Sequence, residues 1–167
     1  MGSGKTSAGR ILAKKLGFRF ADTDLLVEKL SGLSPAGFIN KRGLKAWRKA
    51  ENAAFKAATC AGGHVIALGG GIMPTKIRRP LFRKSGLTVY LECCEAGLIK
   101  RLADDLARRP LLGGNPAEAR LAISRLLKKR RPYYEKADLK LNTCGLTPAQ
   151  TAVKIAKMLE QYENYTR

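Results

Sequence analysis

Two spacings of hydrophobic residues alternate along the chain, one typical of helices and the other typical of strands. In residues 6–16, Ile11, Leu12 and Leu16 fall on one face of a helix with lysines opposite, and Gly17 is placed to end that helix. Short runs rich in β-branched and aromatic residues, ending in acidic residues or glycine, are typical of strands. Strands are predicted over residues 18–24, 64–71, 86–92 and 138–143. Further helices are predicted over residues 25–32, 44–61 and 147–162.

This alternation of strands with helices predicts an α/β fold. Strands that are separated by helices pair in parallel, and the helices then cover both faces of the sheet in three α/β/α layers. The chain of 167 residues lacks repeats and Ser/Pro-rich linkers, so we expect a single domain over residues 1–167. Residues 104–116 are rich in arginine, glycine and proline, fit neither spacing, and are expected to form a mobile loop.

The composition argues against several classes of protein. No stretch approaches the roughly 20 apolar residues of a membrane span, and the N-terminus lacks the order of a secretory signal, so we expect a cytoplasmic protein without a membrane partner. Cys60, Cys93, Cys94 and Cys144 show no paired metal-ligand spacing and no Cys-x-x-Cys, which favours reduced, mostly buried thiols. A single histidine, His64, leaves no material for a zinc cluster or a Ser-His-Asp triad.

The charge of the chain favours anionic partners. Its 32 Lys+Arg against 13 Asp+Glu give a net charge of +19. Such a field attracts phosphates, carboxylates or nucleic acid, and residues 128–131 (KKRR) on their own would suit a nucleic-acid contact. A solvated basic face accounts for these residues equally well. Charge therefore does not choose among these partners.

The first residues match the second half of a phosphate-binding loop. The full motif G-x-x-x-x-G-K-[ST] lies between a strand and a helix, where backbone N–H groups hold the phosphates. Gly2, Ser3, Gly4, Lys5 and Thr6 match its last part and precede the first predicted helix, so we predict that they bind ATP. Lys5 would contact the β- and γ-phosphates, and the Thr6 hydroxyl would bind Mg²⁺.

Acidic residues and glycines follow the first two predicted strands. Asp22 and Asp24 fall at the carboxyl edge where open α/β sheets bind ligands. Phosphoryl transfer uses one carboxylate near Mg²⁺ and another to orient or deprotonate the attacking hydroxyl, so the pair suits a kinase. Alternatively, Asp24 caps the helix that follows. Three consecutive glycines, Gly69, Gly70 and Gly71, would let the backbone approach a ligand closely.

Taken in order, these residues resemble the shikimate kinase family, small P-loop enzymes that phosphorylate the 3-hydroxyl of shikimate. The similarity extends over nearly the whole chain. It comprises GSGKT, the Asp-Thr-Asp of residues 22–24, AWRKAE, GGG, RPLL and RRPYYEKAD. Each motif alone is weak evidence for the family, whereas the order and spacing of all six motifs together are specific to it.

The resemblance implies a role for each matching residue. Asp22 would join the magnesium shell through water. Asp24 would hold the shikimate hydroxyl and act as the base. Arg48 and Arg130 would bind the shikimate carboxylate, because a planar guanidinium can bond two oxygens at once.

Further roles follow for the glycine turn and for the loop. Gly70 and Gly71 would contribute backbone contacts near the substrate and the transferring phosphoryl group. Arg109 would swing in with a lid, bind ATP and spread charge over the transition state. The catalytic residues implied in this way are Lys5, Asp24 and Arg109.

The resemblance also implies the architecture and the partners. The fold would be a P-loop kinase fold in three α/β/α layers, with a short parallel sheet that has five strands in the family and lacks the first of them here, and with a mobile lid at about residues 104–116. A helical region at about residues 24–61 would bind shikimate. Mg²⁺ would be the cofactor, and ATP and shikimate the partners of a monomer that needs no nucleic acid.

The chain departs from the family in three places. The family's first strand and the first glycine of its phosphate loop have no counterpart ahead of GSGKT. We expect a start site assigned too far downstream, or a truncation, to explain this. Trp47 stands where the family commonly has phenylalanine, and residues 38–47 (FINKRGLKAW) are basic where the family often carries acids.

Three functions remain open from the sequence. The first is shikimate phosphorylation by ATP. The second is a related kinase that acts on gluconate or a nucleoside monophosphate, which would need a different acceptor pocket from the one implied by Asp24, Arg48 and Arg130. The third is a catalytically impaired, kinase-derived basic protein that binds nucleic acid. Only Tyr133 and Tyr134 supply aromatic side chains within the basic runs, which weighs against the third function.

Overall fold

The computed structural model describes residues 2–60, 62–73, 75, 78–102, 112 and 116–166. The helices are α1 (Lys5–Leu16), α2 (Thr23–Ser31), α3 (Pro35–Thr59), α4 (Arg79–Ser85), α5 (Glu95–Leu102), α6 (Pro116–Tyr134) and α7 (Pro148–Thr166). The strands are β1 (Arg19–Asp22), β2 (His64–Ala67), β3 (Val89–Glu92) and β4 (Leu139–Asn142).

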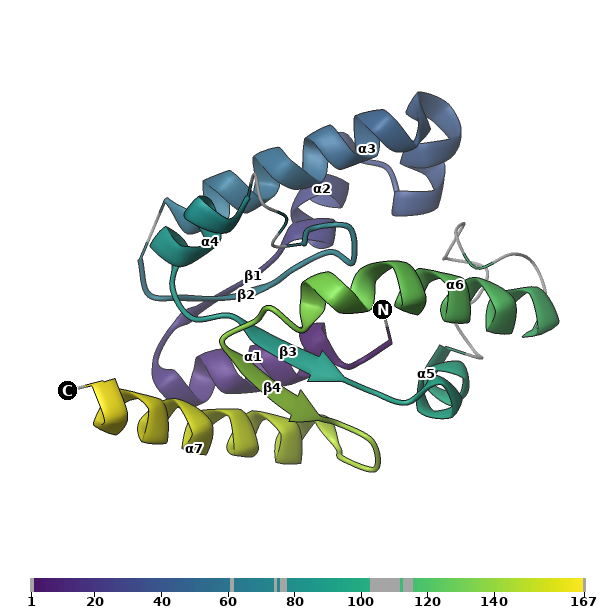
Figure 1. Cartoon of the computed structure of the whole chain (residues 1–167). Helices are drawn as coiled ribbons and strands as arrows, with labels where there is room; N and C mark the ends of the chain where they lie inside the picture. The colour runs from purple at the N-terminus through teal and green to yellow at the C-terminus, as the bar shows by residue number, and fades with distance from the viewer. Residues whose placement is uncertain are drawn as a thin grey trace.

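The strands form two parallel pairs. β1 pairs with β2 so that Asp22 lies opposite Ala67, and β3 pairs with β4 so that Glu92 lies opposite Asn142. In Figure 1, α7 lies below the strands and α1 lies below β1 and β2, whereas α2, α3 and α4 lie above the strands. This arrangement confirms the predicted α/β fold with parallel strands between helical layers.

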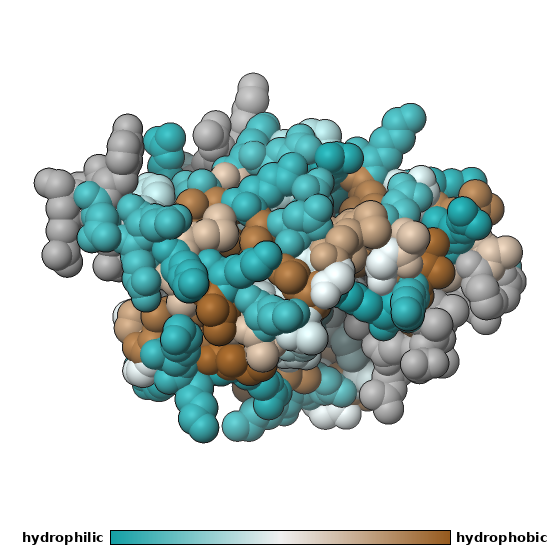
Figure 2. Space-filling view, turned by 90° about the horizontal axis from the view of Figure 1, so that it is seen from below, coloured by the Kyte–Doolittle hydropathy of each residue, from teal (hydrophilic) through white to brown (hydrophobic). Residues whose placement is uncertain are grey.

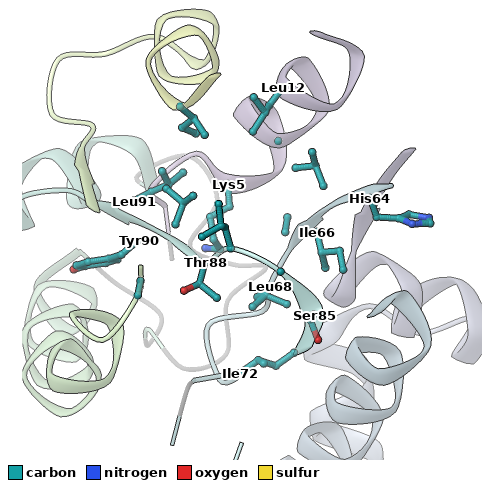
Figure 3. A pocket seen from close by; sticks show the side chains of 18 of the residues that line it. Lys5, Leu12, His64, Ile66, Leu68, Ile72, Ser85, Thr88, Tyr90 and Leu91 are labelled. Carbon is teal, nitrogen blue, oxygen red and sulfur yellow. The ribbon is translucent and has the colours of Figure 1, made fainter. Parts of the chain in front are cut away.

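A cavity of about 570 Å³ separates the two pairs of strands, and we call it the sheet cavity. No ladder joins β2 to β3 within the described part of the chain. Figure 3 shows Ile66 and Leu91 on opposite sides of this space, with Leu12 of α1 above it. The sheet is therefore interrupted at its centre, the place expected for the strand that leads into a phosphate loop.

The first two helices begin in different ways. α1 starts after Gly4, which has φ 85°, and no side chain caps the first turn of this helix. α2 is capped by Asp22, whose carboxylate accepts hydrogen bonds from the backbone N–H groups of Asp24 and Leu25. The alternative that Asp24 is the cap is therefore wrong. The first predicted strand is also shorter than expected, because the Asp22 cap turns the backbone into α2.

Other boundaries differ from the predictions for local reasons. The strand predicted over residues 64–71 ends at Ala67, since the backbone leaves the ladder before the glycines. The helix predicted from residue 44 is the second part of α3, which starts at Pro35 and is kinked at Gly43 with φ 81° and ψ 161°. Helices α4, α5 and α6 were not among the predicted ranges.

The apolar faces of the helices pair around the strands. Leu12 of α1 packs with Ala152 and Ile155 of α7. On the other side, Phe38 and Trp47 meet edge to face with ring centroids 5.5 Å apart. The tryptophan that departs from the family pattern is therefore buried in the packing of α2 against α3.

The thiols are free, as predicted, but only Cys93 is buried, so the expectation of mostly buried thiols is wrong. Figure 2 shows a face covered mainly by hydrophilic side chains with smaller hydrophobic areas between them. Among the described residues, no helix has the length and the apolar composition required to cross a bilayer.

Candidate active site

A second cavity, of about 1090 Å³, opens where α1, α2, α3 and α6 approach the carboxyl ends of β1 and β2, and we call it the site cavity. Every predicted site residue within the described part of the chain lines it. These residues are Gly2, Ser3, Gly4, Lys5, Thr6, Asp22, Asp24, Arg48, Gly70, Gly71 and Arg130. Arg109 and most of the predicted lid lie outside the described residues.

The phosphate loop forms one end of the site cavity. Gly2 and Gly4 have φ 64° and φ 85°, which L side chains rarely adopt. A Cβ on Gly2 would also lie 2.9 Å from Cγ of Leu102. The first turn of α1 has no side-chain cap, so its N–H groups and the positive end of its dipole are available to an anion. Lys5 adds a charge at the same place.

Thr6 and Asp22 lie together beside this turn. The Thr6 hydroxyl donates a 2.6 Å hydrogen bond to Oδ2 of Asp22. Oδ1 of Asp22 accepts the N–H of Asp24 at 2.9 Å, which fixes the carboxylate at the start of α2. A hydroxyl and a carboxylate are hard oxygen donors of the kind that Mg²⁺ takes. The donor set therefore fits this ion.

Asp24 has an unusual environment. Its Oδ1 atom is buried and accepts no hydrogen bond within the described structure. Burial, followed by the nearby charges of Glu51 and Asp22, raises the pKa of Asp24 to about 6, against the opposing effect of Lys5. A carboxyl with this pKa is ionised at neutral pH but holds its proton more strongly than an ordinary aspartate. These properties suit a general base.

Arg48 and Glu51 form an ion pair on one turn of α3. Glu51 is only 1% exposed, so the arginine offsets the cost of burying its charge. Arg48 also lines the site cavity. The sequence spacing i, i+3 places both side chains on one face of the helix.

Gly69, Gly70 and Gly71 form a turn after β2, which we call the glycine turn, and this turn makes room for the charged groups. A Cβ on Gly69 would overlap the carboxylates of Asp24 and Glu51, and one on Gly71 would overlap the guanidinium of Arg48. At Gly70 a Cβ would lie 2.7 Å from Nη1 of Arg130. Each of the three glycines therefore faces a charged side chain, which explains why three are needed.

Arg130 differs from the other cations of its run. It is 8% exposed, whereas Lys128, Lys129 and Arg131 are exposed on α6. Its neighbour on the helix face, Tyr134, donates a 2.8 Å hydrogen bond to the carbonyl oxygen of Gly70. This bond ties α6 to the glycine turn. Only one cation of the KKRR run thus points into the site cavity.

Three residues at the site were given no role in the sequence analysis. Glu51 and Tyr134 lie inside the motifs AWRKAE and RRPYYEKAD, so their positions were available as a signal. Thr23 likewise lies inside the Asp-Thr-Asp motif of residues 22–24. Its buried hydroxyl oxygen accepts a 2.8 Å hydrogen bond from the N–H of Gly69 and so joins α2 to the glycine turn.

Comparison with known proteins identifies the family. A family profile described as shikimate kinase matches residues 1–160. The chain belongs to the shikimate kinase family. It is 40% identical to shikimate kinase from Thermodesulfovibrio yellowstonii over 164 residues, which cover 98% of this chain and 93% of that protein. It is 32% identical to shikimate kinase from Geobacter sulfurreducens, covering 98% of this chain and 88% of the relative.

Solved structures of shikimate kinases have the same fold. The enzyme from Acinetobacter baumannii in complex with shikimate matches with a TM-score of 0.90 and 29% identity, over 97% of this chain and 89% of that chain. Shikimate kinase from Aquifex aeolicus matches with a TM-score of 0.82 and 30% identity, over 98% of this chain and 94% of that chain. The fold is therefore the P-loop kinase fold of the shikimate kinases.

Proposed function

We propose that this shikimate kinase family member transfers the γ-phosphoryl group of ATP to the 3-hydroxyl of shikimate, giving shikimate 3-phosphate and ADP. The observation that carries the proposal is the site cavity itself. It joins a helix N-terminus with Lys5 at one end to Asp24, Arg48 and Arg130 at the other. One end suits a polyphosphate, and the other suits a molecule with both hydroxyl and carboxylate groups.

The phosphate end acts by position and charge. The N–H groups at the start of α1 hold the phosphate oxygens, and Lys5 offsets the negative charge that develops during transfer. Gly2 and Gly4 permit the backbone to surround the phosphates because they take left-handed conformations. Ser3, which is buried between them, completes the loop.

Thr6 and Asp22 would hold Mg²⁺. Their hydroxyl and carboxylate oxygens already lie 2.6 Å apart beside the loop. The bound ion would neutralise charge on the β- and γ-phosphate oxygens. Asp22 has a second task, because its other oxygen caps α2 and so positions Asp24.

The acceptor end binds shikimate and moves its proton. The guanidinium groups of Arg48 and Arg130, which lie against Gly71 and Gly70, bind the carboxylate. Asp24, which lines the site cavity and has a raised pKa, accepts a hydrogen bond from the 3-hydroxyl and takes the proton as the oxygen attacks. Arg109, carried by a lid at about residues 104–116, would stabilise the charge during transfer.

The test is release of ADP from Mg²⁺-ATP that depends on shikimate. We expect turnover with shikimate and none with gluconate or nucleoside monophosphates. Lys5→Ala is expected to abolish turnover while leaving the thermal unfolding transition in place, since the side chain is half-exposed. Near-normal turnover by Lys5→Ala would contradict the phosphate assignment. ADP release that does not depend on shikimate would contradict the acceptor assignment.

The nucleic-acid alternative predicts a different result. A basic binding protein would bind random RNA with strong salt dependence and show no turnover of ATP. The burial of Arg130 argues against this use of the KKRR run. We further propose that the chain acts as a monomer of one domain in the cytoplasm, which sedimentation and cell fractionation would test.

A further inference from the structure

Three cysteines that are far apart in the sequence gather beyond the carboxyl ends of β3 and β4. Cys93 and Cys94 follow β3 directly, and Cys144 comes two residues after β4. Because Glu92 lies opposite Asn142 in the parallel ladder, residue 94 arrives opposite residue 144. Sγ of Cys144 lies 3.7 Å from Sγ of Cys93 and 2.9 Å from Sγ of Cys94. We call these residues the thiol cluster.

The backbone leaves space for the sulfur atoms. Gly97, in the first turn of α5, faces all of them. A Cβ on this glycine would lie 2.8 Å from Sγ of Cys93, 3.3 Å from Sγ of Cys94 and 3.8 Å from Sγ of Cys144. Any other residue would therefore crowd the thiol cluster, although glycine is unfavourable inside a helix.

The surroundings favour negative charge on the sulfur atom of Cys144. The N–H of Cys94 donates a 2.9 Å hydrogen bond to Sγ of Cys144. This bond, together with the Cys94 thiol, lowers the pKa of Cys144 below its usual value. Arg101 lies near the cluster and is held by a 2.6 Å hydrogen bond to the carbonyl oxygen of Thr143. Burial has the opposite effect on Cys93 and raises the pKa of its thiol to about 11.

We propose that Cys93, Cys94 and Cys144 form a three-thiolate binding site for a soft divalent cation of the Zn²⁺ class. The three Sγ atoms all lie within 4.8 Å of one another. Zinc–sulfur bonds of about 2.3 Å in a tetrahedron require sulfur atoms about 3.8 Å apart. The Cys93 and Cys144 sulfur atoms are already 3.7 Å apart, whereas those of Cys94 and Cys144, at 2.9 Å, would separate as the exposed Cys94 side chain turns toward the ion. Thiolates select Zn²⁺ or Cd²⁺ over Mg²⁺, which prefers oxygen.

Binding would proceed through the exposed side of the cluster. Cys94 is exposed and gives the ion an entry path, and the fourth coordination position is left to water. The ion replaces the thiol protons, which pass to the buffer. It would then link the loops after β3 and β4 to the first turn of α5. The last turn of α5 lines the site cavity through Arg101 and Leu102, so the ion would stabilise a wall of that cavity.

The test is a titration of the reduced, metal-free chain with Cd²⁺ in the absence of oxygen. We expect a thiolate-to-metal charge-transfer absorption that saturates at one ion per chain, is displaced by Zn²⁺ and is unaffected by Mg²⁺. Cys144→Ser and Cys94→Ser should each weaken binding at least tenfold. The matched control is Cys60→Ser, which removes an exposed thiol outside the cluster and should leave the titration unchanged.

Gly97→Ala tests the geometry without removing a thiol. The added methyl group would occupy space between the sulfur atoms, so we expect binding to weaken about tenfold while the thermal unfolding transition persists. Absence of a saturable absorption in the reduced chain would overturn the proposal. Equal binding by Cys144→Ser and by the unaltered chain would also overturn it. A Cys94–Cys144 disulfide in chain prepared without reductant, with no Cd²⁺ absorption after reduction, would instead assign a redox pair.

Discussion

Asp24 combines a functional requirement with an energetic cost. Its carboxylate is held among Glu51, Asp22 and the glycine turn, where it lacks a hydrogen-bond donor for one oxygen. Water would supply that donor in the unfolded chain. Burying the carboxylate in a state that can accept a proton therefore lowers the free energy of unfolding. Sites that are arranged for chemistry are often less stable than an inactive substitute would be.

Asp24→Asn should therefore stabilise the fold while it removes activity. The pKa of Asp24 is about 6 in the folded chain against 3.8 for an unperturbed aspartate, so the folded state binds the proton more tightly than the unfolded state. The contribution of Asp24 to stability is full below about pH 4 and is lost as the pH rises through 6. We expect Asp24→Asn to raise the free energy of unfolding by about 1–3 kcal/mol at pH 8 and to lower kcat at least about 100-fold.

Denaturant unfolding at pH 4 and pH 8 checks the prediction. The gain should shrink toward pH 4, where the unaltered carboxyl is also neutral. Glu160→Gln, on the exposed side of α7, is the matched control and should change the free energy of unfolding by less than about 0.5 kcal/mol at either pH. A gain that is equal at both pH values would mean that ionisation of Asp24 is not its cause.

Arg130 supports a second prediction at the scale of single residues. Arg130→Lys keeps the charge but loses the planar fork, so the KM for shikimate should rise about tenfold or more with a smaller change in the KM for ATP. Steady-state kinetics with each substrate varied in turn measure both constants. Lys129→Ala, its exposed neighbour on α6, is the control. Equal effects of the two substitutions would remove Arg130 from the acceptor end.

The sequence predicts most of the individual site residues because the motifs name them by residue type and order. Lys5, Asp24 and Arg130 line one cavity, as the pattern indicates. The thiol cluster could not be predicted in this way, since Cys94 and Cys144 are 50 positions apart. Only the register of β3 against β4 brings them together, and register depends on the whole fold.

At the scale of elements, the glycine turn after β2 is the point where four elements meet. It receives Asp24 from α2, Glu51 and Arg48 from α3, and Arg130 from α6. Its own backbone is fixed by the Thr23 hydroxyl at one residue and by the Tyr134 hydroxyl at the next. The sequence indicates a close approach at this turn, but it cannot show which side chains approach.

Substituting one glycine of this turn should damage the site more than the fold. A Cβ at Gly71 would overlap the guanidinium of Arg48, which is partly exposed and can move away. We expect Gly71→Ala to lower kcat/KM for shikimate about 10- to 100-fold and to change the melting temperature by only a few degrees. Kinetics and thermal unfolding of the same preparation measure both effects.

Gly62→Ala provides the matched control. A Cβ at Gly62 would have no atom within 4 Å, and this glycine precedes the same strand, β2. The activity of Gly62→Ala should equal that of the unaltered chain. If Gly71→Ala were equally active, the space at this turn would have no bearing on the position of Arg48.

For the strands, the boundaries were harder to predict than the existence of each element, whereas helices α4, α5 and α6 were not predicted at all. The apolar runs of β1 to β4 are visible in the sequence because each strand is flanked by acids, glycines or helices. Their ends depend on individual caps, such as Asp22, which stops β1 two residues earlier than the pattern suggests. The Pro35 start of α3 was missed because the left-handed Gly43 interrupts the helical spacing.

At the scale of the whole molecule, the charge and the sheet cavity stand out. The excess of cations is spread over exposed helix faces, and Arg131 and Lys140 both pair with Glu92. The sheet cavity is a structural weakness of a different kind. β2 and β3 present apolar side chains to a space of about 570 Å³, and no ladder joins them in the described structure. Apolar surface around a cavity loses the packing that stabilises a core.

An apolar strand placed in this cavity should stabilise the molecule. Ser3 and Lys5 line one end of the sheet cavity, so a strand joined ahead of Gly2 could pair in parallel with β2 and β3 and lead into the phosphate loop. We expect an N-terminal extension of about six β-branched residues, followed by Gly-x-x, to bury apolar surface in the cavity. This burial should add several kcal/mol to the free energy of unfolding. At about 2–4 °C per kcal/mol, the melting temperature should rise by about 10 °C.

The control is an extension of equal length with proline at two alternate positions, which cannot donate to either ladder. It should leave the melting temperature of the 167-residue chain unchanged. Hydrogen exchange would locate the effect, because the amides of β2 and β3 should gain protection only with the apolar extension. If both extensions raised the melting temperature equally, general contacts of the added residues would explain the gain. In that case, strand pairing within the sheet cavity would be refuted.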